Sequence, residues 1–473
     1  MAEEPQLSAS EEVIEVQLKE TKQESVVIEE AKVFVEEQAI SQSISFKEES
    51  NLVAELPDSH KKALDELKHL VQEALGKHEF YAPAVVVEAP KPAEEVKSDE
   101  KEAAKDPEEA VKDEEKKDDE EKKEEAPIEP EEVFIYGIPL LGDEKSDVIL
   151  LKFLRAREFK VKEAFSMIKN TVKWRKEFGI DSLVEEDFGS EYEKAFYVRG
   201  VSKEGHPVFY NAFGAYEDKD FYHSCFGDEE KRTRFLRWRI QLLEKSIRKL
   251  DFSPTGVSTF VHVNDFKNFF MITKRDVRQA TNQALQILQD NYPEFVAKQV
   301  FINVSWWYLA FNRMISPFLT QRTKSKFVYA GPTKSAETLF RYVSPEHVPV
   351  QFGGLLHRDG DKEFCESDAV SEVIIKPSSK HTVEFPVSEN CCLAWEVRVI
   401  GWEASYCAEF VPSQVEGYTV IVSKTRKVSV NDDPVVSDTY KIGESGKILV
   451  TIENLSSRKK KLLYRVKSKP LID

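Results

Sequence analysis

The spacing of apolar residues divides the chain into regions with different patterns. From Asp147 to Phe178 apolar residues recur every three or four positions, and the pattern breaks around Glu158–Lys160, so we expect two consecutive helices. Further on, short apolar runs alternate with amphipathic stretches. We expect strands at Ala195–Val198, Pro207–Phe213, Val257–Val263, Val300–Val304 and Phe327–Ala330, and helices at Glu229–Leu250, Lys274–Gln289, Trp307–Leu319 and Ala336–Tyr342. This alternation predicts a largely parallel sheet covered by helices.

The helix predicted at Trp307–Leu319 is apolar on more than one side. Trp307, Phe311, Met314 and Phe318 form one stripe, and Tyr308, Ile315 and Leu319 keep the flank apolar. The run TQRTKSK follows and brings Arg322, Lys324 and Lys326 together. Two interpretations remain open at this point: an ordinary core helix followed by a charged loop, or a hydrophobic lid next to a polyanion-binding corner.

The pattern changes again from about Ser371. Short runs such as HTVEFPVS, LAWEVRVIGW and KILVTIENL alternate apolar and polar residues and are separated by turn residues. Their regular spacing predicts an all-β sandwich of seven or eight strands.

Charge separates the N-terminal part from the rest. Residues 1–130 hold 38 acidic and 17 basic residues, a net charge of −21, whereas the remainder holds 47 acidic and 50 basic residues, net +3. Such an acidic segment buries too little apolar surface to offset its ordering entropy, so we expect the N-terminal third to be disordered. One amphipathic helix, at about 58–75, is the exception. The pattern leaves open whether it frays alone, docks on the folded body or binds a partner.

Catalytic, metal and nucleic-acid motifs are missing from the sequence. There is no P-loop, HExxH or G-x-S-x-G motif, and the nine histidines show no metal-ligand spacing. The charges of the basic stretch after Lys231 spread around its predicted helix, so we expect no nucleic-acid partner. His262, on a predicted strand, is interpreted as a hydrogen-bonded core histidine. We therefore expect no catalytic residues, no metal and no cofactor.

Targeting signals and cysteine usage favour the cytoplasm. The N-terminus MAEEPQLSAS lacks the apolar segment of a signal peptide, and no apolar run reaches the length of a membrane-spanning helix. The five cysteines form no CxxC pair, so we expect reduced thiols.

Three separated motifs carry a family resemblance. LLKFLRAREFKVKEAF followed by WRKEFG resembles the N-terminal helical lobe of CRAL-TRIO lipid-binding domains of the yeast phosphatidylinositol-transfer type. NYPEFVAKQVFINVSWWYLAFNRMISPFL, with TKSKFVY after it, is similar to that family's YPE turn, core strand and mobile gate helix, and PVQFGG is similar to its closing motif. The region from LAWEVRVIGW to RKKKLLYRV resembles a GOLD domain. An acidic tail, then CRAL-TRIO, then GOLD is the layout of the plant patellin family.

The resemblance implies a domain division and a fold. We expect an acidic disordered region with its single helix at 1–132, a CRAL-TRIO helical lobe at 133–190, an α/β lipid-binding domain at 191–357 and a GOLD-like β-sandwich at 366–470.

The resemblance also implies a site. The headgroup-binding residues of the family fall on Arg157, Glu294, Thr323 and Lys326, and the gate helix falls on Trp307, Tyr308, Phe311, Met314, Ile315, Phe318 and Leu319. Arginine and lysine suit a phosphate, while threonine and glutamate can bond ring hydroxyls. The yeast-type motif has a second basic residue directly after the arginine, where this chain has Glu158.

The implied function is phosphoinositide or phospholipid binding, as a carrier or sensor at membrane surfaces. A role in membrane trafficking during cell-plate formation and cytokinesis is implied with it. The protein would be cytoplasmic and peripherally membrane-bound, with the cell plate as a candidate location and a candidate protein partner for the GOLD domain. Two alternatives remain: a non-transferring scaffold or adaptor that uses the GOLD domain, and a lipid-acting enzyme.

Overall fold

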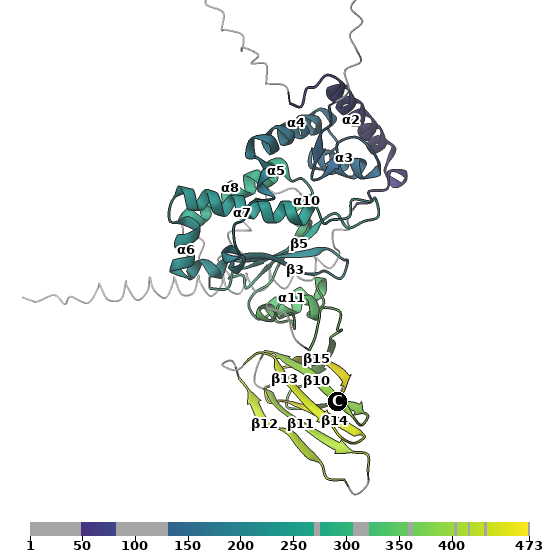
Figure 1. The fold of residues 1–473 in the computed structure, drawn as a ribbon, viewed down its shortest axis with the longest axis vertical. Coiled ribbons are helices and arrows are strands. Elements are labelled where there is room, and N and C mark those ends of the chain that lie inside the picture. Colours follow the sequence, from purple (N-terminus) through teal and green to yellow (C-terminus); the bar gives the residue numbers. More distant parts are fainter. Residues whose placement is uncertain are drawn as a thin grey trace, which may run out of the picture.

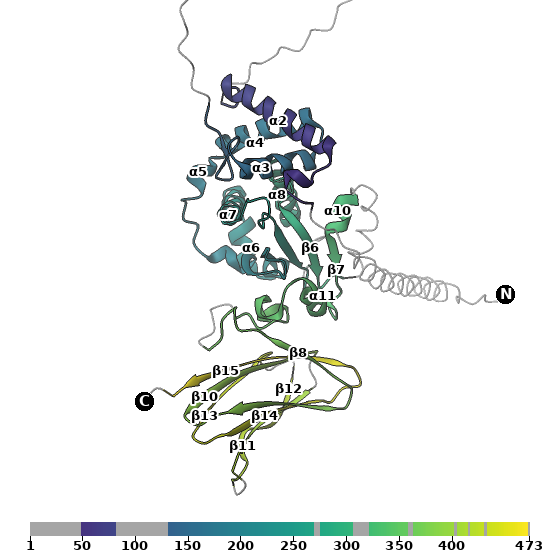
Figure 2. The ribbon, with the colours of Figure 1, turned by 90° about the vertical axis from the view of Figure 1, so that its right-hand side faces the viewer.

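The computed structural model describes residues 49–81, 131–268, 275–305, 321–357, 363–401, 404–414, 417–429 and 433–471. These residues form an elongated molecule with three parts along its long axis (Figures 1 and 2). A helical lobe lies at one end, a β-sandwich at the other, and an α/β layer lies between them. Of the acidic region that we predicted to be disordered, at 1–132, residues 1–48 and 82–130 lie outside the described residues.

The helical lobe is built from amphipathic helices. They are α2 (Asp58–Gly76), α3 (Glu144–Ala156), α4 (Val161–Phe178) and the short α5 (Ile180–Leu183), with a small hairpin of β1 (Phe134–Ile135) and β2 (Ile138–Pro139). The predicted break between α3 and α4 is confirmed. Glu158 and Phe159 take positive φ angles of 51° and 59° there, and α4 ends at Gly179, whose φ is 71°.

The helix α2 docks on the folded body, which resolves the alternatives that the sequence left open. Its apolar stripe packs against α3 and α4, with Leu64 1% exposed and both Leu67 and Val71 fully buried. Outside the helix, Phe80 meets Phe165 of α4 edge-on. The helical lobe therefore begins before residue 133, the boundary that we expected, because the apolar face of α2 completes its core.

The α/β layer holds a five-stranded sheet in the order β3-β4-β5-β6-β7. The strands are β3 (Phe196–Val201), β4 (Pro207–Ala212), β5 (Phe260–Asp265), β6 (Val296–Ile302) and β7 (Phe327–Tyr329). β3 and β4 form an antiparallel pair, and every later neighbour pair is parallel. The predicted, largely parallel sheet is confirmed.

Helices cover both faces of this sheet. α6 (Lys219–Phe226), α7 (Glu229–Ile247) and α8 (Arg275–Asn291) lie on one face, and α11 (Ser335–Tyr342) lies on the other, toward the sandwich (Figures 1 and 2). The six-residue α10 (Gln321–Lys326) leads into β7. We call the first face the helix-facing side of the sheet. The predicted helix at Trp307–Leu319 lies outside the described residues.

Paired glycines close the α/β layer in the run PVQFGG. Gly353 has a φ of 110°, and a Cβ there would lie 2.7 Å from the Cβ of Ala336. At Gly354 a Cβ would lie 2.0 Å from the carbonyl oxygen of Val348, closer than atoms can approach. Only glycine fits this turn, which brings the chain against α11 before it enters the sandwich.

The sandwich consists of two antiparallel four-stranded sheets, ordered β13-β10-β15-β8 and β12-β11-β14-β9. Its strands are β8 (Ser371–Ile375), β9 (Lys380–Val387), β10 (Cys391–Ile400), β11 (Ala404–Pro412), β12 (Val420–Val428), β13 (Val436–Ile442), β14 (Gly446–Asn454) and β15 (Lys460–Pro470). The predicted all-β sandwich is confirmed. All five cysteines are free thiols.

Candidate functional site

Aromatic side chains line the helix-facing side of the sheet. Phe209, Phe260, Phe301 and Tyr329 belong to the core shared with the helices, whereas their neighbours Val208, Val261, Val300 and Val328 pack on the α11 side. The alternation follows from the two-residue period of a strand. One sheet therefore serves two separate cores.

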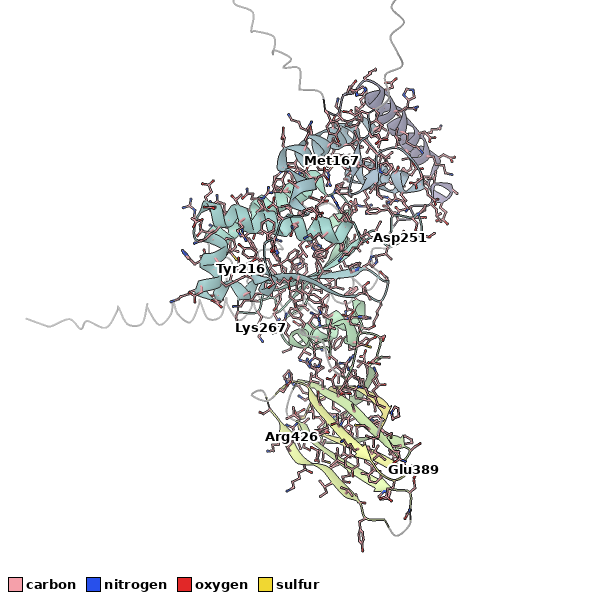
Figure 3. All side chains as sticks on the ribbon, in the orientation of Figure 1. Met167, Tyr216, Asp251, Lys267, Glu389 and Arg426 are labelled. Carbon is pink, nitrogen blue, oxygen red and sulfur yellow. The ribbon has the colours of Figure 1, made fainter. Side chains whose placement is uncertain are left out.

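The aromatic rings form a continuous row near the carboxyl ends of the parallel strands. The ring of Phe213 stacks on Phe266 at 4.9 Å, Phe266 lies 6.2 Å from Phe301, and Phe301 stacks on Tyr329 at 5.0 Å. We call these four residues the aromatic floor. In Figure 3 Tyr216, whose ring lies 6.3 Å from that of Phe213, is found beside the sheet. Such a surface suits an apolar ligand, and the carboxyl end of a parallel sheet is the usual position for a ligand.

A charged cluster lies at the turn between the end of α8 and the start of β6. Tyr292 donates a hydrogen bond to Glu244 at 2.7 Å, which ties this turn to α7. Glu294 follows with a φ of 56°, and its carbonyl oxygen accepts a bond from Lys152 of α3 at 2.9 Å. The turn is thus fixed from both sides, and it directs the Glu294 carboxylate toward α10.

The Glu294 carboxylate receives three charged hydrogen bonds. Arg322 donates to both of its oxygens, through Nε at 3.0 Å and Nη2 at 3.1 Å, and Lys326 donates at 2.8 Å. Burial alone would raise the pKa of Glu294, but the charge of Lys326 and the bonds from Arg322 and Lys326 outweigh it, so the pKa is lowered. The carboxylate is therefore ionised, and the cluster holds two cations for one anion.

The structure brings together two of the four predicted headgroup residues, Glu294 and Lys326. Arg157 ends α3, and its Nη1 donates to the carbonyl of Ala156 at 3.1 Å. Among the described residues, no hydrogen bond or ion pair joins Arg157 to Glu294 or Lys326. The side chain of Thr323 and the predicted gate helix lie outside the described residues.

Arg157 instead lines a groove between α4 and the end of α8. The groove has a volume of about 660 Å³ and is shared with Met167, Trp174 and Asp290. Met167 marks its position in the helical lobe in Figure 3. Glu158, the residue that departs from the family motif, is exposed beside it.

Arg322 is the site residue that the predicted set left out. The sequence placed it in a basic run beside Lys326, but its bidentate contact with Glu294 spans 28 residues of sequence. A run of basic residues carries no information about which of them will meet a buried carboxylate.

The described residues show neither a metal-binding cluster nor a membrane-spanning helix. They contain no group of three or more His, Cys, Asp or Glu side chains that could hold a metal ion. None of the described helices is both long enough and apolar enough to cross a bilayer.

Models of known domain families match three parts of the chain. The CRAL/TRIO domain matches residues 191–354, the CRAL/TRIO N-terminal domain matches residues 63–170, and the Patellin-1-like C-terminal GOLD domain matches residues 376–461. The N-terminal match begins within α2, in agreement with the docking of that helix.

Curated relatives cover most of the chain. Patellin-3 of Arabidopsis thaliana is 51% identical over 429 residues, which are 90% of this chain and 78% of that protein. Patellin-4 of the same plant is 40% identical over 512 residues, covering 94% of this chain and 93% of that protein. The phosphatidylinositol transfer protein SFH5 of Meyerozyma guilliermondii is 32% identical over 203 residues, 40% of this chain and 60% of that protein. Among solved structures, the crystal structure of Sfh5 aligns with a TM-score of 0.44 and 21% identity, covering 63% of this chain and 88% of that one.

Proposed function

Since this chain belongs to the patellin family, with a CRAL-TRIO domain followed by a GOLD domain, we propose that it binds a membrane lipid and presents it at membrane surfaces. The aromatic floor is the observation that carries this proposal. A two-tailed lipid buries roughly 30 CH₂ groups at about 0.8 kcal/mol each, so a protein that holds one must offer a large apolar surface. The four stacked rings along the strand ends, each 4 to 8% exposed in this structure, are the apolar side chains that we propose the lipid contacts.

The lipid headgroup is proposed to lie at the cluster of Glu294, Arg322 and Lys326. Arg322 and Lys326 both direct their donors into this cluster, so a phosphate placed there would meet two cationic side chains. Glu294 has oxygen atoms that can accept bonds from inositol hydroxyls. A phosphoinositide is therefore the ligand class that we propose, in line with the name of the related phosphatidylinositol transfer protein.

The cellular role is proposed from the family. Lipid binding at the cytoplasmic surface of membranes would serve trafficking during cell-plate formation and cytokinesis, with peripheral attachment at the cell plate. The GOLD sandwich would contribute a protein contact.

Mass spectrometry of lipids that co-purify with the full chain tests the proposal. We expect phospholipids, with phosphatidylinositol or its phosphates enriched over the lipids of the host cell. Transfer between vesicles, measured alongside, separates a carrier from a scaffold. The same incubation reports lipid turnover, which would indicate an enzyme. Recovery of no lipid from protein that remains folded would refute the proposal.

A substitution tests the headgroup cluster. Lys326→Ala removes one of the two cations on Glu294, so binding to vesicles of phosphatidylcholine with phosphatidylinositol 4-phosphate should fall by roughly tenfold. Uptake of phosphatidylcholine should be unchanged, because the aromatic floor is untouched. Lys334→Ala is the matched control, since Lys334 is 62% exposed and pairs only with nearby Glu337 among the described residues. Equal loss of both lipids in Lys326→Ala would place the headgroup elsewhere.

A further inference from the structure

The segment before α2 reaches the charged cluster and places a carboxylate between two arginines. Oε2 of Glu49 lies 2.9 Å from Nε of Arg155, and Oε1 accepts a hydrogen bond from Nη1 of Arg322. In Figure 2 this segment runs down from α2 beside α10. Glu49 thus joins the end of α3 to the α10 segment that carries Lys326.

Arg155 depends on this segment for its partners. Its Nη1 bonds the side-chain oxygen of Asn51 at 2.5 Å, and its Nη2 bonds the carbonyl of Ser50 at 2.7 Å. The Arg155 side chain is only 7% exposed, and burial lowers its pKa in spite of the opposing effect of Glu49. A guanidinium this deeply buried is costly unless an anion lies against it.

The charge balance of the cluster depends on Glu49. With Glu49 in place, three cations (Arg155, Arg322 and Lys326) face two carboxylates, those of Glu49 and Glu294. Among the ion pairs of the described residues, withdrawal of Glu49 removes one of the two carboxylates that these three cations contact, and it leaves the contact of Arg322 and Lys326 with Glu294 in place. A phosphate monoester carries close to two negative charges at neutral pH, and two guanidinium groups are its preferred partners in proteins.

We propose that Arg155 and Arg322 form a second phosphate position beside the headgroup cluster, and that Glu49 occupies it within the free protein as a competing anion. The proposal rests on the proposed function, because it assigns the additional monoester phosphate of a phosphoinositide to these two arginines. Neither arginine belongs to the set of Arg157, Glu294, Thr323 and Lys326 that the family resemblance implies.

Glu49 is placed so that it can leave while α2 stays. Its side chain is 45% exposed, and the segment that holds it is a coil followed by a single short 3-10 helix at Val53–Glu55. The apolar anchors all follow Glu49: Val53 is partly buried against the core, Leu56 is 7% exposed, and the buried stripe of α2 continues them. Withdrawal of Glu49 exposes little apolar surface, so a phosphate has mainly the Glu49 ion pairs to displace.

The test is a comparison of Glu49→Gln with Glu55→Gln in the full chain. Glu55 lies on the same segment, is exposed and has the same charge, but it makes no ion pair or side-chain hydrogen bond among the described residues. Each variant is titrated with vesicles of phosphatidylcholine that contain phosphatidylinositol 4-phosphate, phosphatidylinositol or phosphatidylserine. Soluble inositol 1,4,5-trisphosphate and inorganic phosphate are titrated separately by calorimetry, to distinguish a lipid headgroup from a free phosphate.

We expect Glu49→Gln to bind phosphatidylinositol 4-phosphate vesicles roughly fivefold more tightly than the unchanged protein, since a charge-assisted competitor worth about 1 kcal/mol has been removed. Phosphatidylinositol and phosphatidylserine vesicles, which lack a monoester phosphate, should show little gain. Glu55→Gln should match the unchanged protein. Adding Arg322→Gln to Glu49→Gln should abolish the gain while leaving Glu294 paired with Lys326.

Two outcomes overturn the proposal. If Glu49→Gln and Glu55→Gln behave alike, the gain is a general charge effect or is absent. If Glu49→Gln lowers the melting temperature without any gain in affinity, Glu49 is a structural ion pair only. Failure of the proposed function would be recognised separately, because no lipid would co-purify with the protein. The calorimetric titration with inositol trisphosphate would still report whether Arg155 and Arg322 bind phosphate.

Discussion

At the scale of single residues, His262 shows how burial sets a charge state. It lies in β5 with its ring 5.1 Å from that of Phe209, and its buried Nε2 has no hydrogen-bond partner among the described residues. Burial, and then the charge of Arg239 on α7, lowers the pKa of His262 to about 4. The imidazole is therefore neutral at pH 7. His262 was expected to be a hydrogen-bonded core histidine; its Nε2 is buried, but that atom lacks the expected hydrogen bond among the described residues.

His262 should make the protein less stable in acid. Between pH 6.5 and 4 the unfolded chain binds a proton at His262 that the folded chain does not, so stability is lost as the pH falls through this window. The loss approaches roughly 2 to 3 kcal/mol near pH 4. We expect His262→Gln, which cannot titrate there, to lose less melting temperature between pH 7 and 4.5 than the unchanged protein. His381→Gln in β9 is the control, and an equal fall in all three proteins would contradict the prediction.

The charged cluster shows which residue-level contacts a sequence can predict. Glu294 and Lys326 could be named together because a family motif carries both. Arg322 and Glu49 lie 273 residues apart and meet because α2 docks on α3 and α4, which brings the segment before α2 to α10. Hydrophobic periodicity predicts which face of a helix is buried, but it holds no information on where long charged side chains meet across elements.

At the scale of elements, α2 is the case in which pattern predicted the structure but not its place. Its apolar stripe predicted a helix whose end lies within one residue of the observed end, Gly76. The same pattern of apolar residues is expected whether a helix packs against its own chain or against a partner, so the docking of α2 on the helical lobe could not be predicted from the sequence. Other elements were missed because their pattern is weak: α6 is only eight residues long, and β13 (VSDTYKI) has few apolar residues.

Leu67→Ala tests the docking of α2. Leu67 is fully buried in the core of the helical lobe, so truncation should lower the free energy of unfolding by about 2 to 4 kcal/mol. The neighbouring Glu66 is exposed, and Glu66→Ala should change it by less than about 0.5 kcal/mol. Urea unfolding followed by circular dichroism measures both. Equal, small effects would mean that α2 does not contribute to the folded core.

At the scale of the whole molecule, the sandwich and the α/β layer share one interface. Leu463 of β15 and Val435 pack in the same core as Leu339 of α11 and Leu355. Arg398 of β10 donates to the carbonyls of Val350 and Gly354 at 2.5 and 2.8 Å. The order of the domains could be predicted from their separate patterns, but this interface could not, because its residues also fit the core of either domain alone.

A buried ion pair lies within this interface. Arg465 of β15 donates to Glu396 of β10 at 2.7 Å and also to the carbonyl of Leu355 at 3.0 Å. Glu396 is 1% exposed and lies 2.9 Å from Nε2 of His357, at the end of the α/β layer. The pair therefore ties the sandwich to the chain that enters it, on the side of the sheet opposite the aromatic floor.

Breaking this ion pair should make the sandwich and the α/β layer unfold at different temperatures. Arg465→Gln removes the guanidinium from the buried Glu396 carboxylate, and breaking a buried ion pair from one side costs about 3 to 5 kcal/mol. The cost falls on the sandwich and its interface, so we expect calorimetry to show one unfolding transition for the unchanged protein and two for Arg465→Gln, with the sandwich melting first. Lys447→Gln is the control: its pair with Glu384 is about half exposed, and its loss should change stability by less than about 0.5 kcal/mol.

Lipid binding should survive in Arg465→Gln at temperatures below the first transition, because the aromatic floor and the cluster of Glu294 lie on the α/β side. If lipid binding is lost there while the α/β layer stays folded, the sandwich takes part in holding the ligand, and the interface couples the two domains in function as well as in stability.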